Sequence, residues 1–177
     1  MRKLLLTIGF ALMLIPAAAQ QEHTGYRLPD EPKRAKYVDY PSLNTGFWFA
    51  VQATPAFATE EGFIFQADVV AGYRGGEFFR FGPGVSARFA PSGFALPVYL
   101  DLRGNIISQE SRMVVPYWSL DAGYTFATDY KGIYASPTVG IRVGMPRNDF
   151  IAGLTYMLQM GLDTPVHAVG LRLGFEF

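Results

Sequence analysis

The feature that most constrains this chain is an alternation of apolar residues with small or polar ones, which recurs from Leu43 to Phe177. It is clearest in the last stretch, where one parity is apolar: Val169, Leu171, Leu173, Phe175 and Phe177. The other parity is small or charged: Ala168, Gly170, Arg172, Gly174 and Glu176. Successive side chains of a strand point to opposite faces, so this pattern predicts a sheet with one apolar and one polar, charged face. That polarity favours a transmembrane β-barrel, which is apolar outside and polar inside.

Turn residues divide the alternating region into about eight segments, each long enough for a tilted strand to cross a hydrocarbon layer. They lie near residues 44–54, 62–74, 77–89, 94–105, 113–126, 133–145, 149–160 and 167–177. Eight is the smallest strand number of bacterial single-chain barrels, in which even numbers are the rule. We therefore predict an all-β fold, a closed antiparallel transmembrane barrel of about eight strands over residues 43–177.

Four prolines fall inside the predicted strands: Pro83, Pro97, Pro116 and Pro137. Proline has no N–H to donate to a neighbouring strand, so each one interrupts a ladder of hydrogen bonds. The alternation alone leaves the strand register around these positions open.

The beginning of the chain has the composition of a secretory signal peptide. Arg2 and Lys3 precede the apolar run 4–15, and Ala17 to Ala19 supply an A-x-A cleavage site. We predict a signal peptide over 1–19 and a polar periplasmic lead-in over 20–42, with the barrel in the outer membrane of a Gram-negative bacterium. The chain has no cysteine, so we expect neither a lipoprotein anchor nor disulfides.

Composition excludes several other classes of protein. Beyond the signal peptide the sequence has no apolar run of the roughly 20 residues that a membrane-spanning helix needs. The formal net charge is +0 and there is no basic block, so we expect no nucleic-acid partner. With two histidines and no cysteine, we expect no metal and no cofactor.

The polar parity carries a set of charged residues that would face the interior of a barrel. Arg74, at the end of the segment 62–74, has the same parity. The set is Asp68, Arg80, Arg88, Asp101, Arg103, Asp121, Arg142, Arg172 and Glu176. The interior of an eight-stranded barrel is just wide enough for side chains to fill it, and wide pores use 16 to 18 strands. We predict a packed network of ion pairs without a wide pore. The alternative is a pathway for ions lined by the same charges.

Two other functions compete with a structural or interaction role at the cell envelope. In a lipid-modifying barrel enzyme, His167 would need a base–nucleophile partner, and Asp163 and Thr164 are the polar residues nearby in sequence. In a secreted lipocalin-like binder, the apolar parity would face inward around an apolar ligand. We expect no enzyme, because nothing next to His167 completes a catalytic group.

The chain resembles the small outer-membrane β-barrel proteins of the OmpA/OmpX type, with porin-like barrel domains. The resemblance is carried by the signal peptide, the strand phrase 116–124 and the closing segment 171–177. It implies outer-membrane lipid as the surroundings. It also implies that Phe175 and Phe177 form the signal by which the barrel-assembly machinery recognises its clients, although Arg172 stands where that signal prefers glycine. The predicted outer loops are short, unlike the long outer hairpins of the OmpX type.

Overall fold

The computed structural model describes residues 39–110, 112–127, 131–161 and 165–177. The predicted signal peptide and most of the lead-in lie outside this part of the chain. A short helix, α2 (Tyr40–Leu43), comes first. Eight strands follow: β1 (Gly46–Ala58), β2 (Gly62–Arg74), β3 (Arg80–Ala90), β4 (Gly93–Asn105), β5 (Val114–Ala127), β6 (Gly132–Met145), β7 (Asn148–Met160) and β8 (Pro165–Glu176). Among these residues no helix has the length and hydropathy to cross a membrane.

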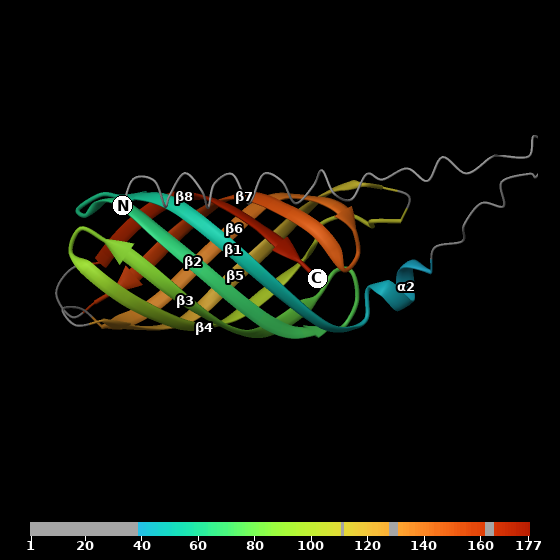
Figure 1. Ribbon diagram of the computed structural model, residues 1–177, viewed down its shortest axis with the longest axis horizontal. Coiled ribbons are helices and arrows are strands. Elements are labelled where there is room, and N and C mark those ends of the chain that lie inside the picture. Colours follow the sequence, from blue (N-terminus) through green and yellow to red (C-terminus); the bar gives the residue numbers. More distant parts are fainter. Residues whose placement is uncertain (1–38, 111, 128–130, 162–164) are drawn as a thin grey trace, which may run out of the picture. The chain divides into compact units, whose positions relative to one another are not determined.

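The strands form one closed antiparallel barrel in chain order, because β8 pairs with β1 as well as with β7 (Figure 1). The predicted fold class and strand number are confirmed. The first strand is longer than predicted: 55–58 belong to β1, whereas the sequence placed 55–61 in a loop. The alternation continues through Ala56 and Phe57, but Pro55 indicates a turn in the sequence.

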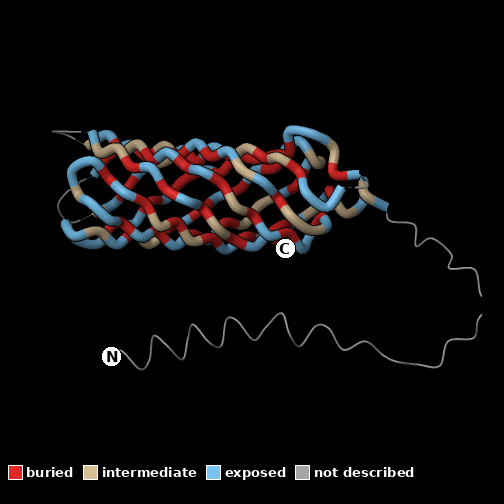
Figure 2. Tube along the Cα trace, turned by 90° about the horizontal axis from the view of Figure 1, so that it is seen from above, coloured by how far each residue is buried: buried red, intermediate tan, exposed pale blue. Residues whose placement is uncertain are grey.

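The two faces of the sheet have the polarity that the alternation predicts. Buried and exposed positions alternate along the strands (Figure 2). In β8 the side chains of Arg172 and Glu176 are buried, whereas Leu171 and Phe175 are exposed on the outside. This is the reverse of a lipocalin-like binder, whose apolar face lies inside, and it is the arrangement of a transmembrane barrel.

The prolines interrupt individual ladders without shifting the register. The paired positions of β2 and β3 stop on either side of Pro83, and those of β3 and β4 on either side of Pro97. The same happens at Pro137 between β6 and β7 and at Pro55 between β1 and β8. In each case the pairing resumes in the same register, because one missing donor removes a bond but adds no residue.

Pro116 avoids such a gap because it lies at the end of a ladder. It keeps its place opposite Ile141 in the pairing of β5 with β6. On its other side, β4 has already ended at Asn105, and the Pro116 carbonyl accepts a hydrogen bond from the N–H of Ile106 (2.8 Å). All four prolines that left the register open are therefore accommodated within a regular barrel.

The barrel has two rims, which we call the terminal rim and the distal rim. The terminal rim is the end at which β1 begins and β8 ends, and it carries the connections 75–79, 106–113 and 146–147. The distal rim carries the connections 59–61 and 91–92, and β5 and β7 end at it. The longest connection between two strands, 106–113, therefore lies on the terminal rim.

Aromatic pairs lie on the outer surface near both rims. Near the distal rim, Phe57 packs edge-on against Phe63 with ring centroids 5.5 Å apart, and Phe89 packs against Phe94 at 5.4 Å. Near the terminal rim, Phe150 packs against Phe175 at 5.3 Å. Aromatic girdles at the two membrane–water interfaces are typical of transmembrane barrels.

Candidate functional site in the barrel interior

The candidate site is the set of charged side chains inside the barrel. All nine predicted interior residues are buried, and the most exposed of them, Arg88, is 3% exposed. Arg74, expected inside at the end of its segment, is buried as well, and the structure adds Asp149, which the sequence prediction left out. Asp149 is the second residue of β7, directly after the turn 146–147, where the alternation is only beginning.

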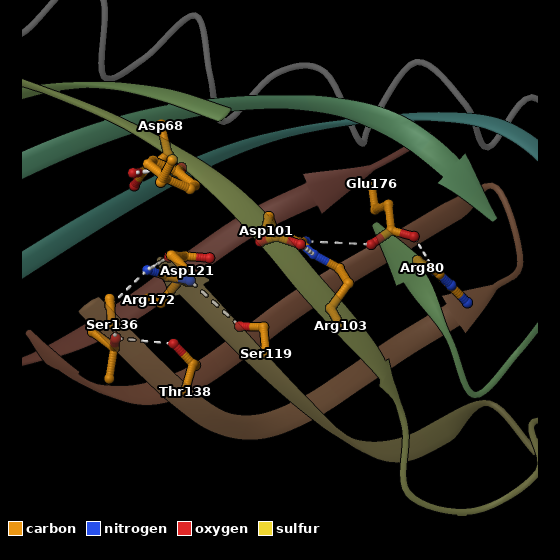
Figure 3. Close-up of polar contacts among 12 residues, drawn as sticks. Asp68, Arg80, Asp101, Arg103, Ser119, Asp121, Ser136, Thr138, Arg172 and Glu176 are labelled. Atoms are coloured by element: carbon orange, nitrogen blue, oxygen red, sulfur yellow. Dashed lines mark hydrogen bonds and ion pairs between the residues drawn. The ribbon is translucent and has the colours of Figure 1, made fainter. Parts of the chain in front are cut away.

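Glu176 of β8 is the centre of the network near the terminal rim. Its carboxylate forms ion pairs with Arg74 (3.2 Å), Arg103 (3.5 Å) and Arg142 (3.1 Å), and with Arg80. These arginines come from β2, β3, β4 and β6, so one carboxylate joins five of the eight strands. Figure 3 shows the side chains of Arg80 and Arg103 on either side of it.

Arg103 connects this centre to the next carboxylate. It binds Asp101 through two nitrogens, with Nε–Oδ1 at 2.7 Å and Nη2–Oδ2 at 2.5 Å. Its guanidinium also lies 4.6 Å from the ring centre of Trp48, and the amide oxygen of Gln52, turned toward it, accepts from both Nη atoms at 2.7 Å. A bidentate ion pair and a cation–π contact fix the guanidinium in one orientation.

Arg172 forms a second ion pair in the middle of the barrel. Its Nη2 lies 2.6 Å from Asp121 Oδ2 and 3.1 Å from the hydroxyl of Ser136, and its Nη1 lies 3.4 Å from the hydroxyl of Ser119 (Figure 3). The contact crosses the barrel from β8 to β5 and β6, which are not neighbours of β8 in the sheet.

Toward the distal rim the charges are linked through an amide instead of by direct contact. Gln66 donates to Asp68 Oδ1 (2.7 Å) and accepts from Arg88 Nε (2.9 Å). Arg88 also donates to Gln159 (2.6 Å) and lies 5.2 Å from the ring centre of Tyr134. Within the described part of the chain Arg88 makes no ion pair, so Gln66 carries the interaction between this cation and Asp68.

Two polar side chains reach the network from outside the barrel wall. Asn44, just after α2, is buried and its Oδ1 accepts from Arg80 Nη2 (3.3 Å). Gln109, in the connection 106–113, is fully buried and donates to Asp149 Oδ1 (3.2 Å). Both cover the interior at the terminal rim. The sequence prediction left out Asn44, which begins the first alternating segment, because the predicted network contained charged residues only, and it missed Gln109 because that residue lies outside the alternating segments.

Arg147 holds the segment around α2 against this rim. It occupies the turn between β6 and β7 with a positive φ of 74°. Its guanidinium donates to the carbonyl oxygens of Ser42 (3.3 Å), Leu43 (3.3 Å) and Thr45 (2.9 Å). These carbonyls lie at the end of α2, where a helix leaves its acceptors without intrahelical partners.

His167 has two polar contacts among the described residues. Its Nδ1 lies 2.5 Å from the hydroxyl of Tyr156 on the outer surface, and the Thr59 hydroxyl donates to its main-chain oxygen (3.0 Å). Asp163 and Thr164, the candidates from the sequence, lie outside the described residues. The same part of the chain contains no group of three His, Cys, Asp or Glu side chains suited to a metal ion.

Comparison with known proteins found solved structures of similar fold. No model of a known protein family matches the sequence, and no curated protein matches it. The crystal structure of the neisserial surface protein A has a TM-score of 0.60 and 18% identity, over 73% of this chain and 95% of that one. The N-terminal β-barrel domain of Pseudomonas aeruginosa OprF has a TM-score of 0.49 and 18% identity, over 76% and 98%.

The likeness to the neisserial protein is one of fold. This likeness agrees with the resemblance to small outer-membrane β-barrel proteins that was noted from the sequence. The polarity of the two faces and the aromatic residues near both rims lead to the same class independently of that likeness.

Proposed function

We propose that this protein is an integral outer-membrane barrel whose charged interior is a structural filling, with an interaction role at the cell envelope and no catalysis. The observation that carries the proposal is the centre at Glu176, where arginines from four strands meet one carboxylate in the interior. A wide conducting pore would need these side chains to line the wall and leave the axis open.

The energetics of buried charge support a filling role. A buried ion is stabilising only if it is paired and its hydrogen bonds are satisfied, and removing one partner costs about 3–5 kcal/mol. The Asp101–Arg103 pair meets both conditions, and the Asp121–Arg172 pair and the Glu176 centre meet the first. Among the described residues, Asp121 Oδ1 and Arg172 Nε have no hydrogen-bond partner. In a barrel of eight strands these long side chains occupy the space that a lumen would need.

Conductance of the reconstituted protein tests this proposal. Folded protein is first identified by a gel shift between unheated and boiled samples, and is then inserted into planar lipid bilayers. We expect the shift and no sustained open channel. A stable conductance that changes on substitution of Arg103 or Arg172 by methionine would contradict the filling role and favour an ion pathway. The distal-loop variant Glu61→Gln serves as the control.

We also propose that Phe175 and Phe177 serve in recognition by the barrel-assembly machinery. Both side chains are exposed on the outside at the end of β8, where another protein can reach them. Phe177→Ala should lower the amount of heat-modifiable protein in the outer membrane of growing cells. Phe94→Ala, at an exposed position near the distal rim, is the matched control. An equal loss from both variants would contradict a specific signal at β8.

A further inference from the structure

The connections of the terminal rim differ: 75–79 and 106–113 carry large exposed apolar side chains, whereas 146–147 carries none. Four large apolar residues in the connections on either side of β3 and β4 are exposed: Phe78 (52%), Ile106 (51%), Ile107 (41%) and Met113 (69%). We call this set the apolar foot. In Figure 1 the segment that joins β4 to β5, yellow, extends beyond the turn between β6 and β7 on the same rim.

Hydrogen bonds fix the main chain that carries the apolar foot. The Glu77 carboxylate accepts from the hydroxyl of Ser108 (3.1 Å) and the N–H of Gln109 (2.9 Å). On the other side of the loop, the carbonyl of Met113 accepts from the N–H of Gly144 (2.8 Å). The loop is tied to the connection before β3 and to the end of β6, so its apolar side chains are held outside by an ordered structure.

A glycine allows the two connections to lie together. A Cβ at Gly104 would collide with the main chain of Phe78, because the carbonyl of Phe78 lies directly against that position. Close approach of two backbones is a common reason for glycine within a strand. The contact places Phe78 beside the end of β4. Ile106 and Ile107 follow that end directly in the sequence.

The apolar foot continues the lipid-facing surface of the barrel. It lies at the terminal ends of β3, β4 and β5, which are neighbours in the sheet. Phe79 and Phe81 extend the surface from Phe78 along β3, and Val114 extends it from Met113 along β5, all of them exposed. No polar residue lies between Phe78 and Phe79 or between Met113 and Val114, so the apolar foot joins the lipid-facing surface at both points, while Glu110 and Arg112 are exposed elsewhere in the same loop.

The distance of the apolar foot from the middle of the barrel, measured along the membrane normal, corresponds to the headgroup layer of a bilayer. Strands of 13 residues, such as β4, rise about 3.3 Å per residue and, tilted by about 40°, reach about 16 Å on either side of the barrel's middle. The headgroup layers of a bilayer end about 20–22 Å from its centre. Residues that follow directly after β4 lie between these two levels.

From this position and continuity we infer that the apolar foot binds the phospholipid surface of the leaflet at the terminal rim, anchoring one side of the barrel in the headgroup layer. The inference rests on the proposed outer-membrane placement. With the termini in the periplasm, this leaflet is the inner one. Lipid contact would then extend further from the membrane centre along β3–β5 than along β7 and β8.

Spin labels on single introduced cysteines test the inference, because the chain has no cysteine of its own. Ile107→Cys and Met113→Cys are labelled in refolded protein in phosphatidylcholine–phosphatidylglycerol vesicles. Collision with dissolved oxygen and with a water-soluble nickel chelate is then measured. Leu100→Cys, on the lipid-facing side of β4, is the lipid control, and Glu110→Cys, exposed in the same loop, is the water control.

We expect the labels at 107 and 113 to collide with the nickel chelate several-fold less than the label at 110, and to remain accessible to oxygen. Accessibility to the chelate equal to that of position 110 would overturn the inference. Shielding from both reagents would overturn it too, because it indicates contact with protein, such as a second copy of the chain.

The gel shift of each labelled variant separates this result from the proposed function. If the shift and the lipid pattern at Leu100 are present, the barrel is folded and inserted, and the labels at 107 and 113 report on the apolar foot alone. If the pattern at Leu100 is that of water, the membrane placement itself has failed.

Discussion

The guanidinium of Arg142 on β6 lies 3.1 Å from the carboxylate of Glu176 on β8, so this ion pair joins two strands that are not neighbours in the sheet. Hydrogen bonds between strands act only along the wall. Contacts of this kind, with those of Arg103 and Arg80 to the same carboxylate, connect the wall across the interior. The closed barrel is therefore stabilised both by the hydrogen bonds between neighbouring strands and by the ion pairs across its interior.

Glu176→Gln should destabilise the barrel strongly. The substitution keeps the shape of the side chain but removes the negative charge that four arginines share, and breaking a buried ion pair costs about 3–5 kcal/mol. The free energy of unfolding, measured by urea titration of refolded protein in detergent, should fall by about that amount. Glu61→Gln on the distal rim should change it little. A loss below about 1 kcal/mol would contradict a central role for Glu176.

The Asp121–Arg172 pair should show strong coupling in a double-mutant cycle. Asp121→Leu and Arg172→Met each leave a buried partner without its counter-charge, whereas the double variant removes both charges. We expect the double variant to lose less stability than the sum of the single losses, with a coupling energy of about 1–3 kcal/mol. Strictly additive losses in urea unfolding would show that the two side chains do not act as a pair.

Gly123→Ala should impair folding, because a Cβ there would collide with the main chain of Val98 and Tyr99 on β4. The neighbouring strand would have to move, and forcing extra volume into a packed site costs about 1–3 kcal/mol. Gly75→Ala is the matched control, since its Cβ would come no closer than 3.7 Å to the Phe79 carbonyl. The heat-modifiable fraction after refolding should fall for the first variant only.

Arg147→Asn should loosen α2 while leaving the turn intact, because asparagine tolerates the positive φ of this position. Loss of the hydrogen bonds to Ser42, Leu43 and Thr45 should cost about 1–2 kcal/mol locally. Hydrogen exchange at the amides of Leu43 and Asn44, which donate within this segment, should then rise roughly 5- to 30-fold. Lys131→Gln, at the distal rim, should leave these rates unchanged. Equal rates in both variants would show that Arg147 does not hold the segment.

The alternation of residue types was sufficient to predict the fold. A one-residue slip would exchange the two faces of a strand, so a sustained parity specifies which side chains face inward. This is why the second segment, predicted near 62–74, has the bounds of β2. The pattern failed at Pro55 because proline signals a turn locally, whereas the closed sheet accommodates it by omitting one bond of a ladder.

The pairing of the interior charges could not be read from the sequence. Parity places Arg88 and Asp68 inside, but which side chains meet depends on the stagger of the strands around the barrel. Arg88 thus interacts with Gln66 and Gln159 instead of a carboxylate. Gln109 was missed for a different reason: it enters from a connection, whose conformation depends on tertiary contacts such as those of Glu77. Asn44 begins the first predicted segment and was left out because the predicted network contained charged residues only.

The convergence on Glu176 has a consequence for how the protein is made. The seam between β1 and β8 joins segments far apart in the chain, and such pairings form slowly because loop closure must precede them. Until β8 takes its place, the arginines of β2, β3, β4 and β6 lack the carboxylate that they share. An incomplete sheet therefore leaves buried guanidinium groups without Glu176, and leaves Asp121 without Arg172, in a nonpolar medium, which disfavours insertion of unfinished intermediates. The interior network thereby works as a form of proofreading, because β8 brings both Glu176 and Arg172 and so completes the buried ion pairs without changing the net charge of the interior.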